Sequence, residues 1–207
     1  MEKLTILVDV DNVLEDLHTP WVNALNKKYG TNVKPEEITS WCIEEYFPSL
    51  SRTQVFSPLH DKAFWKKLDP MYGAKNILER LKIDGHKLYV ATSSHPDTVK
   101  YKCDFIHHNF GTVFSHNDII IIHDKQLLNA DVLIDDAPHN LVNANYAGIL
   151  FSSPHNAGYN AKDNNLHRAD NWDDVYAIIN NISKSFEDHI RDIENRLWQE
   201  LTVKGEY

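Results

Sequence analysis

Short runs of consecutive apolar residues alternate along the chain with longer stretches in which apolar and polar residues mix. The runs cover residues 4–10 (LTILVDV), 87–93 (KLYVATS), 118–122 (DIIII), 131–136 (DVLIDD) and 147–152 (AGILFS). Each run is short and rich in aliphatic residues, which is typical of strands that are covered on both faces. The pattern therefore predicts five strands of a parallel sheet.

Helical spacing marks the stretches between these strands. Residues 73–85 carry apolar positions three and four apart and end at Gly85, and residues 96–111 begin at Pro96 and end at Gly111. A longer amphipathic stretch covers residues 172–201. Because strands and helices alternate, we expect an α/β fold with a doubly wound parallel sheet.

Residues 15–72 interrupt this alternation, because they are rich in aromatic residues and contain no convincing strand. We expect them to form a small helical cap, inserted after the first strand, that covers an active site. The core domain then comprises residues 1–14 and 73–200, and residues 201–207 form a C-terminal tail. The aromatic residues of the insert include Trp21, Tyr29, Trp41, Tyr46, Phe47, Phe56, Phe64 and Trp65.

Composition and charge exclude some classes of partner and location. A chain of 207 residues, 42% of them hydrophobic, is long enough for one sizeable core. It has 21 basic and 30 acidic residues, a net charge of −9 and no Lys/Arg-rich run, so we expect no nucleic acid polymer as partner. Cys42 and Cys103 lie outside any metal-ligand spacing, and the apolar run at the start is too short for a signal peptide or a membrane span. We therefore expect a cytoplasmic protein without membrane association.

Polar residues that could take part in catalysis or binding lie at the ends of four of the predicted strands or just after them. Ligands of open parallel sheets bind at the carboxyl ends of the strands, so these side chains are expected to meet at one edge. Carboxylates suit Mg²⁺, whereas hydroxyl and ammonium groups suit the oxygens of a phosphoryl group. The residues are Asp9 and Asp11, Thr92 and Ser93, Lys125, and Asp135 and Asp136.

Each of these motifs also has a purely structural interpretation. A lone D-x-D is common at a strand-end turn, the Asp135–Asp136 pair could cap a helix, and Lys125 could be a solvated loop lysine. The twelve histidines show no ligand spacing and are interpreted as surface or packing residues. Only the joint occurrence of the motifs at successive strand ends favours a phosphotransfer site.

Four of these segments resemble, in order, the motifs of the haloacid-dehalogenase superfamily. They are DVDNV at 9–13, ATSS at 91–94, HDK at 123–125 and LIDDAP at 133–138. More narrowly, residues 64–78, 118–140, 151–156 and 166–179 are similar to the 5'(3')-deoxyribonucleotidases, and the resemblance covers about residues 4–180. That family usually has Gly where this chain has Asn12. The resemblance implies a Rossmann-like core with a cap.

The resemblance also implies a role for each matching residue. Asp9 is expected to attack phosphorus and Asp11 to act as general acid and base, while Thr92 and Lys125 hold the phosphate. Mg²⁺ is expected between Asp9, the carbonyl of Asp11 and one carboxylate of the pair that follows the fourth strand. Asp135 is the first choice for that ligand, and Asp136 either supports it or takes its place.

Substrate binding is expected from Ser93 at the phosphate and from the aromatic residues Phe64, Trp65 and Trp41 in the cap. The resemblance supports the pair Phe64–Trp65, whereas Trp41 rests on composition alone. His155 and Asn156 match a family position near the substrate, so this pair stays open as site residues.

We therefore expect a Mg²⁺-dependent 5'-nucleotidase that hydrolyses deoxyribonucleoside or ribonucleoside monophosphates through an aspartyl phosphate. A response-regulator receiver has its motifs in another order, and a three-carboxylate nuclease requires a basic groove. A haloacid-dehalogenase-type phosphatase of a sugar phosphate or another small phosphomonoester is the alternative, because it differs only in the cap. The oligomeric state is left open, with a homodimer as one option.

Overall fold

The computed structural model describes residues 2–203. Its strands are β1 (Thr5–Val8), β2 (Lys87–Thr92), β3 (Ile119–Ile121), β4 (Val132–Asp135), β5 (Ala147–Phe151) and β6 (His167–Ala169). Its helices are α1 (His18–Tyr29), α2 (Arg52–Phe56), α3 (Lys62–Trp65), α4 (Ala74–Ile83), α5 (Val99–Phe110), α6 (Pro138–Leu141) and α7 (Trp172–Val203). Short 3₁₀ turns connect several of them.

The strands form one parallel sheet in the order β3-β2-β1-β4-β5-β6. β1 lies in the middle, where Leu7 pairs with Tyr89 on one side and Leu133 on the other. This confirms the predicted doubly wound α/β fold. β6 was missed, because its three residues, His-Arg-Ala, have no apolar run.

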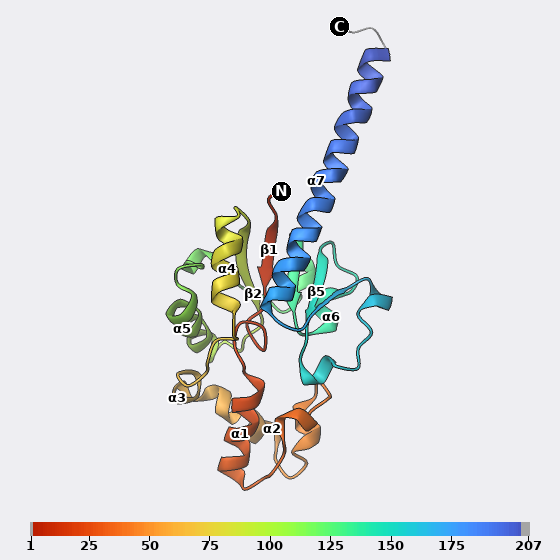
Figure 1. Cartoon of the computed structure of the whole chain (residues 1–207). Coiled ribbons are helices and arrows are strands. Elements are labelled where there is room, and N and C mark those ends of the chain that lie inside the picture. Colours follow the sequence, from red (N-terminus) through yellow and green to blue (C-terminus); the bar gives the residue numbers. More distant parts are fainter. Residues whose placement is uncertain (1, 204–207) are drawn as a thin grey trace.

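Helices cover both faces of the sheet. On one face, the apolar side chains of β1, β2, β4 and β5 pack with residues from α4, α5 and α7, such as Leu78, Ile106 and Ile179. On the other face, Leu7, Leu133 and neighbouring residues pack against α6 and the segment before β6. The carboxyl ends of the strands are left uncovered by these helices, and they face α1, α2 and α3 (Figure 1).

The segment around α1, α2 and α3 has an apolar cluster of its own, formed by Val22, Leu25, Ile38, Ile43, Phe47 and Val55. It contains helices and 3₁₀ turns, and none of the six strands of the sheet lies in it. The two ends of the segment lie side by side, since Met71 N donates to Leu14 O at 2.8 Å and Glu15 forms an isolated bridge with Pro70. The domain boundaries at 15 and 72 stay a prediction.

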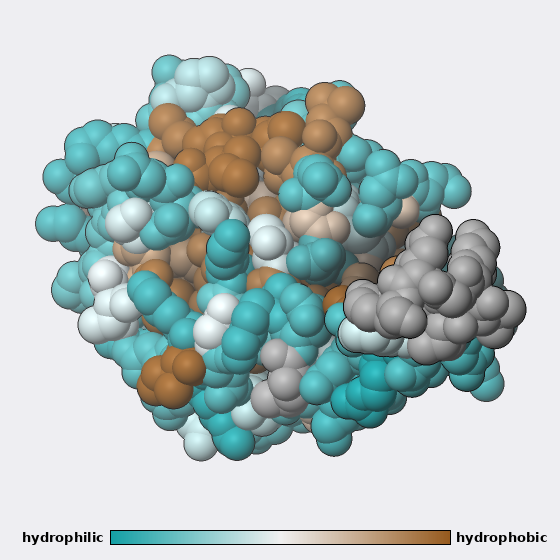
Figure 2. Space-filling model, turned by 90° about the horizontal axis from the view of Figure 1, so that it is seen from above, coloured by the Kyte–Doolittle hydropathy of each residue, from teal (hydrophilic) through white to brown (hydrophobic). Residues whose placement is uncertain are grey.

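The last helix is longer than the sequence pattern indicated. α7 continues to Val203, so residues 201–203 of the predicted tail are helical, and residues 204–207 lie outside the described residues. Its second half extends away from the body (Figure 1) and carries half-exposed Phe186, Ile190, Ile193 and Leu197. Figure 2 views the molecule from this end, which is mostly hydrophilic, with one larger apolar area and smaller apolar patches elsewhere. Within residues 2–203, no helix is both long and apolar enough to cross a membrane.

Candidate active site

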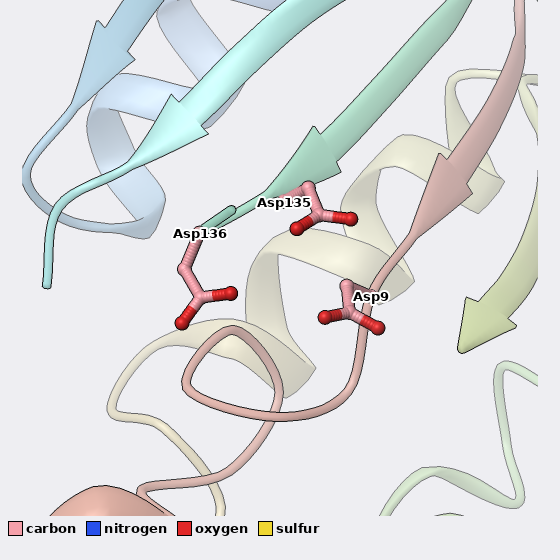
Figure 3. Close-up of side chains that lie close together, drawn as sticks. All are labelled: Asp9, Asp135 and Asp136. Carbon is pink, nitrogen blue, oxygen red and sulfur yellow. The ribbon is translucent and has the colours of Figure 1, made fainter. Parts of the chain in front are cut away.

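Three carboxylates meet where β1 and β4 end. Asp9 follows β1, Asp135 is the last residue of β4, and Asp136 comes directly after it. One oxygen of each lies within 4.8 Å of one oxygen of each of the others, and all three residues are buried. Figure 3 shows the three side chains around a common space. The sequence analysis brought the same carboxylates together, and the arrangement can hold a divalent cation.

Lys125 lies next to this cluster with only 2% of its side chain exposed. Its Nζ is 2.7 Å from Asp9 Oδ1 and 2.6 Å from Asp135 Oδ2. Burial alone lowers the pKa of the Lys125 ammonium, but Asp9 and Asp135 outweigh burial and raise that pKa above its usual value. Lys125 therefore stays charged and offsets part of the repulsion between the two carboxylates.

Both oxygens of Asp135 are engaged by protein groups. Oδ2 accepts from Lys125 and from Asn140 Nδ2 at 3.0 Å, and Oδ1 accepts from the amide of Ala137 at 2.8 Å. Burial and the neighbouring Asp9 raise the pKa of Asp135 to about 6 although Lys125 lowers it. These hydrogen bonds fix the Asp135 carboxylate in place, and it in turn positions the ammonium group of Lys125.

Asp136 differs from Asp135 in its partners. Its Oδ2 accepts from Asn12 Nδ2 at 2.9 Å and lies 3.3 Å from His155 Nε2, but no group among the described residues donates to Oδ1. Burial, followed by the Asp135 charge, raises the pKa of Asp136 well above its usual value. A buried carboxylate with a free oxygen, beside two like charges, is suited to bind a cation.

A second lysine lies on the other side of the site. Lys102 of α5 is buried, and its Nζ donates to Asp11 Oδ2 at 2.8 Å, to Ser93 O at 2.7 Å and to Thr92 Oγ1 at 3.2 Å. Sequence reasoning missed Lys102, which lies outside the four motifs. The contacts join the ends of β1 and β2, so the predicted residues Asp11, Thr92 and Ser93 come together around one ammonium group.

Glu15 was also missed. It is fully buried, and neither carboxylate oxygen has a hydrogen-bond partner among the described residues. Burial and then the Asp11 charge raise the pKa of Glu15 well above its usual value, against the effect of Lys102. The raised pKa favours a neutral carboxyl, which can lie beside Asp11 without adding a second charge.

A cavity of about 970 Å³ opens between this edge of the sheet and the helical segment. Asp11, Ser93 and Lys102 line its floor, and Trp41 and Trp65 are among its aromatic residues. Trp65 is nearly buried and its Nε1 donates to Leu59 O at 2.7 Å, so its ring is fixed in place. Phe64 does not line this cavity and packs in the main core instead.

Trp41 is 57% exposed and lies against two histidines, with ring centroids 5.0 Å from both His139 and His155. Only 6% of the His155 side chain is exposed, and its ring also contacts Asp136. Burial lowers the pKa of His155 to about 4, and burial also lowers the pKa of His139. Both imidazoles are therefore neutral near pH 7, and Trp41 covers the Asp136 side of the site.

The fold has counterparts among solved structures. A phosphatase described as predicted, from Clostridium acetobutylicum, has a TM-score of 0.62 at 14% identity and covers 86% of this chain and 99% of its own. A HAD family hydrolase from Deinococcus radiodurans, solved with phosphate and sodium, has a TM-score of 0.61 at 14% identity and covers 86% and 95%. The parallel sheet thus has the fold of haloacid-dehalogenase-type hydrolases.

Sequence comparison narrows this class. The model of the family described as "5' nucleotidase, deoxy (Pyrimidine), cytosolic type C protein" matches residues 3–186, and the chain belongs to this family. A 5'(3')-deoxyribonucleotidase from Clostridium acetobutylicum is 30% identical over 182 residues, which is 88% of this chain and 98% of that protein. One from Bacillus subtilis is 29% identical over 175 residues, or 84% and 96%. The enzyme class is therefore phosphomonoester hydrolase.

Proposed function

We propose that this protein is a Mg²⁺-dependent 5'-nucleotidase that converts deoxyribonucleoside or ribonucleoside monophosphates to nucleoside and phosphate through an aspartyl phosphate at Asp9. The observation that carries the proposal is the pairing of two features at one edge of the sheet. Asp9 lies beside two further buried carboxylates and Lys125. A cavity with aromatic walls adjoins this cluster and is lined by the neighbouring residues Asp11 and Asn12.

The metal is best held by Asp9 and Asp136, together with the carbonyl of Asp11. This reverses the first choice of the sequence analysis, and the reason is hydrogen bonding. Both oxygens of Asp135 already accept from protein donors, whereas Asp136 Oδ1 has no donor among the described residues. Hard carboxylate oxygens at this spacing fit Mg²⁺. When bound, the ion supplies positive charge for the phosphate oxygens.

Different residues carry out different parts of the reaction. Asp9, at the end of the central strand, attacks phosphorus, and Lys125 balances its charge and that of the phosphate. Asp11 donates a proton to the leaving ester oxygen and later accepts one from the attacking water. Lys102 fixes the carboxylate of Asp11 and the hydroxyl of Thr92 in place.

The nucleoside occupies the cavity above. Trp65 has a fixed ring in the wall, and Trp41 offers a second, more exposed surface on the Asp136 side. Stacking of a base on an aromatic ring contributes about 1–3 kcal/mol. Phe64, which packs in the core, acts on the substrate only by supporting Trp65, whose ring centroid lies 6.3 Å away. Location in the cytoplasm and assembly as a homodimer stay predictions.

The test is phosphate release from a panel of deoxyribonucleotides, ribonucleotides and sugar phosphates, with and without Mg²⁺. We expect nucleoside monophosphates to be preferred, EDTA to abolish the activity and Mg²⁺ to restore it. A preference for sugar phosphates would move the assignment to the alternative phosphatase, which the family match does not favour. Asp136→Ala should need far more Mg²⁺ than Asp135→Ala, and the opposite order would refute the metal ligands given above.

A further inference from the structure

Asn12, next to Asp11 in the turn after β1, has a backbone conformation that is uncommon for residues other than glycine. Its φ angle is +56°, in the left-handed region that few residues other than glycine adopt readily. It lies in the tight turn after β1, where the amides of Val13, Leu14 and Glu15 all donate to Val10 O. Glycine meets this backbone requirement without a side chain, so the side chain of Asn12 is an addition that the turn itself does not need.

The amide group of Asn12 makes two hydrogen bonds in opposite directions. Its Nδ2 donates to Asp136 Oδ2 at 2.9 Å, and its Oδ1 accepts from the backbone N–H of His18 at 3.0 Å. Asp136 directly follows β4 of the core sheet, whereas His18 is the first residue of α1. One side chain thus joins the carboxylate cluster to the helical segment above it.

The bond to His18 matters because the start of α1 has no capping side chain of its own at the N-cap position. The first N–H groups of a helix have no partner within the helix. Here His18 N–H is bound by Asn12, Thr19 N–H is bound by Asp16 Oδ1 at 3.1 Å, and Pro20 has none. Asn12 therefore satisfies a helix donor from outside the helix and links the first turn of α1 to the turn after β1.

We propose that Asn12 is a positioning residue that couples the carboxylate of Asp136 to the first turn of α1, so that Mg²⁺ binding below stabilises the wall of the substrate cavity above. The proposal rests on the proposed function in so far as Asp136 binds Mg²⁺. His18 and Asn12 both line the cavity, which gives the coupling a direct route to the nucleoside.

The test replaces Asn12 by glycine. Asn12→Gly removes both hydrogen bonds but keeps the positive φ, whereas alanine there would add backbone strain. Asn165→Gly is the matched control, because Asn165 also has a positive φ, of 55°, and is exposed away from the site. Mg²⁺ affinity is measured by calorimetry with Mg²⁺ alone, and hydrogen exchange is followed at the first amides of α1 with and without Mg²⁺.

In the wild type and in Asn165→Gly, we expect Mg²⁺ to slow exchange at the start of α1. In Asn12→Gly, exchange there should be about fivefold faster, should no longer respond to Mg²⁺, and the Mg²⁺ affinity should be about tenfold weaker. The KM for a deoxyribonucleotide should rise more than that for p-nitrophenyl phosphate, because only the nucleotide reaches the wall.

If Asn12→Gly binds Mg²⁺ as the wild type does and α1 still responds to the ion, the coupling is refuted while the proposed function stands. If the wild type binds Mg²⁺ and shows the coupling but hydrolyses no nucleotide, the proposed function fails and the coupling stands. A wild type that binds no Mg²⁺ overturns both.

Discussion

Replacement of Lys125 by methionine tests the electrostatic balance of the site. Methionine matches the length of the lysine stem but removes the ammonium group that lies 2.7 Å from Asp9 and 2.6 Å from Asp135. Because all three side chains are almost completely buried, water cannot replace the lost charge. Breaking a buried ion pair in this way costs about 3–5 kcal/mol of unfolding free energy.

For a chain of this size, that loss corresponds to a Tm lower by about 6–20 °C. The loss of stability should depend on pH, because protonation of Asp135 removes the negative charge that Lys125 no longer balances. Its pKa is already raised to about 6, from an ordinary value of 3.8, and rises further without Lys125. A carboxyl with a raised folded-state pKa loses stability as the pH rises through that pKa. The variant should therefore be closer to the wild type at pH 5.5 than at pH 8.

The assay is urea unfolding in EDTA at both pH values, with phosphate release measured in parallel. Lys102→Met is the control, since Lys102 is equally buried but pairs with Asp11, whose side chain is 33% exposed and can be solvated by water. Both variants should lose activity, but only Lys125→Met should lose several kcal/mol of stability. A loss below about 1 kcal/mol at pH 8 would refute this account of the carboxylate cluster.

Three further predictions concern single residues. Asp9→Asn should keep the fold and abolish turnover, because an amide cannot act as the nucleophile; more than a few per cent residual activity would exclude the covalent mechanism. Trp65→Leu should weaken turnover of thymidine monophosphate far more than that of p-nitrophenyl phosphate, and equal losses would show that the ring only supports the fold. His155 has a pKa of about 4 when folded and an ordinary value of 6.5, so between these pH values only the unfolded chain binds a proton there. The unfolding free energy should therefore fall as the pH drops from 6.5 to 4, and the slope should flatten in His155→Gln; an unchanged slope would contradict the burial of this imidazole.

The sequence predicts the sheet well and brings the candidate site residues to one end of it, because apolar strands and the residues at their ends are local features. Asp9 and Lys125 could be placed at one edge for this reason. Lys102 could not, because nothing in the linear sequence indicates which face of α5 turns toward Asp11. Glu15 could not be identified as buried either, since its burial depends on packing around the turn after β1.

The sequence also could not decide which of Asp135 and Asp136 is the better candidate metal ligand. Adjacent residues at a strand end point in different directions, and the sequence does not say which carboxylate finds protein donors. Only the three-dimensional contacts distinguish them, through Lys125 and Asn140 on Asp135 and the free oxygen of Asp136.

The adjacent ends of the helical segment have a consequence for how this enzyme can change over evolution. Because the chain leaves the core at Leu14 and returns at Met71 through a direct hydrogen bond, the segment is inserted without disturbing any strand pairing. Its length and sequence can vary while the two anchor points stay in place. In the proposed function, exchange of this one segment would be a route to new substrates that leaves the phosphate chemistry intact. A transplanted segment would have to re-establish the hydrogen bond between Asn12, just before the exit point, and the first turn of its helix.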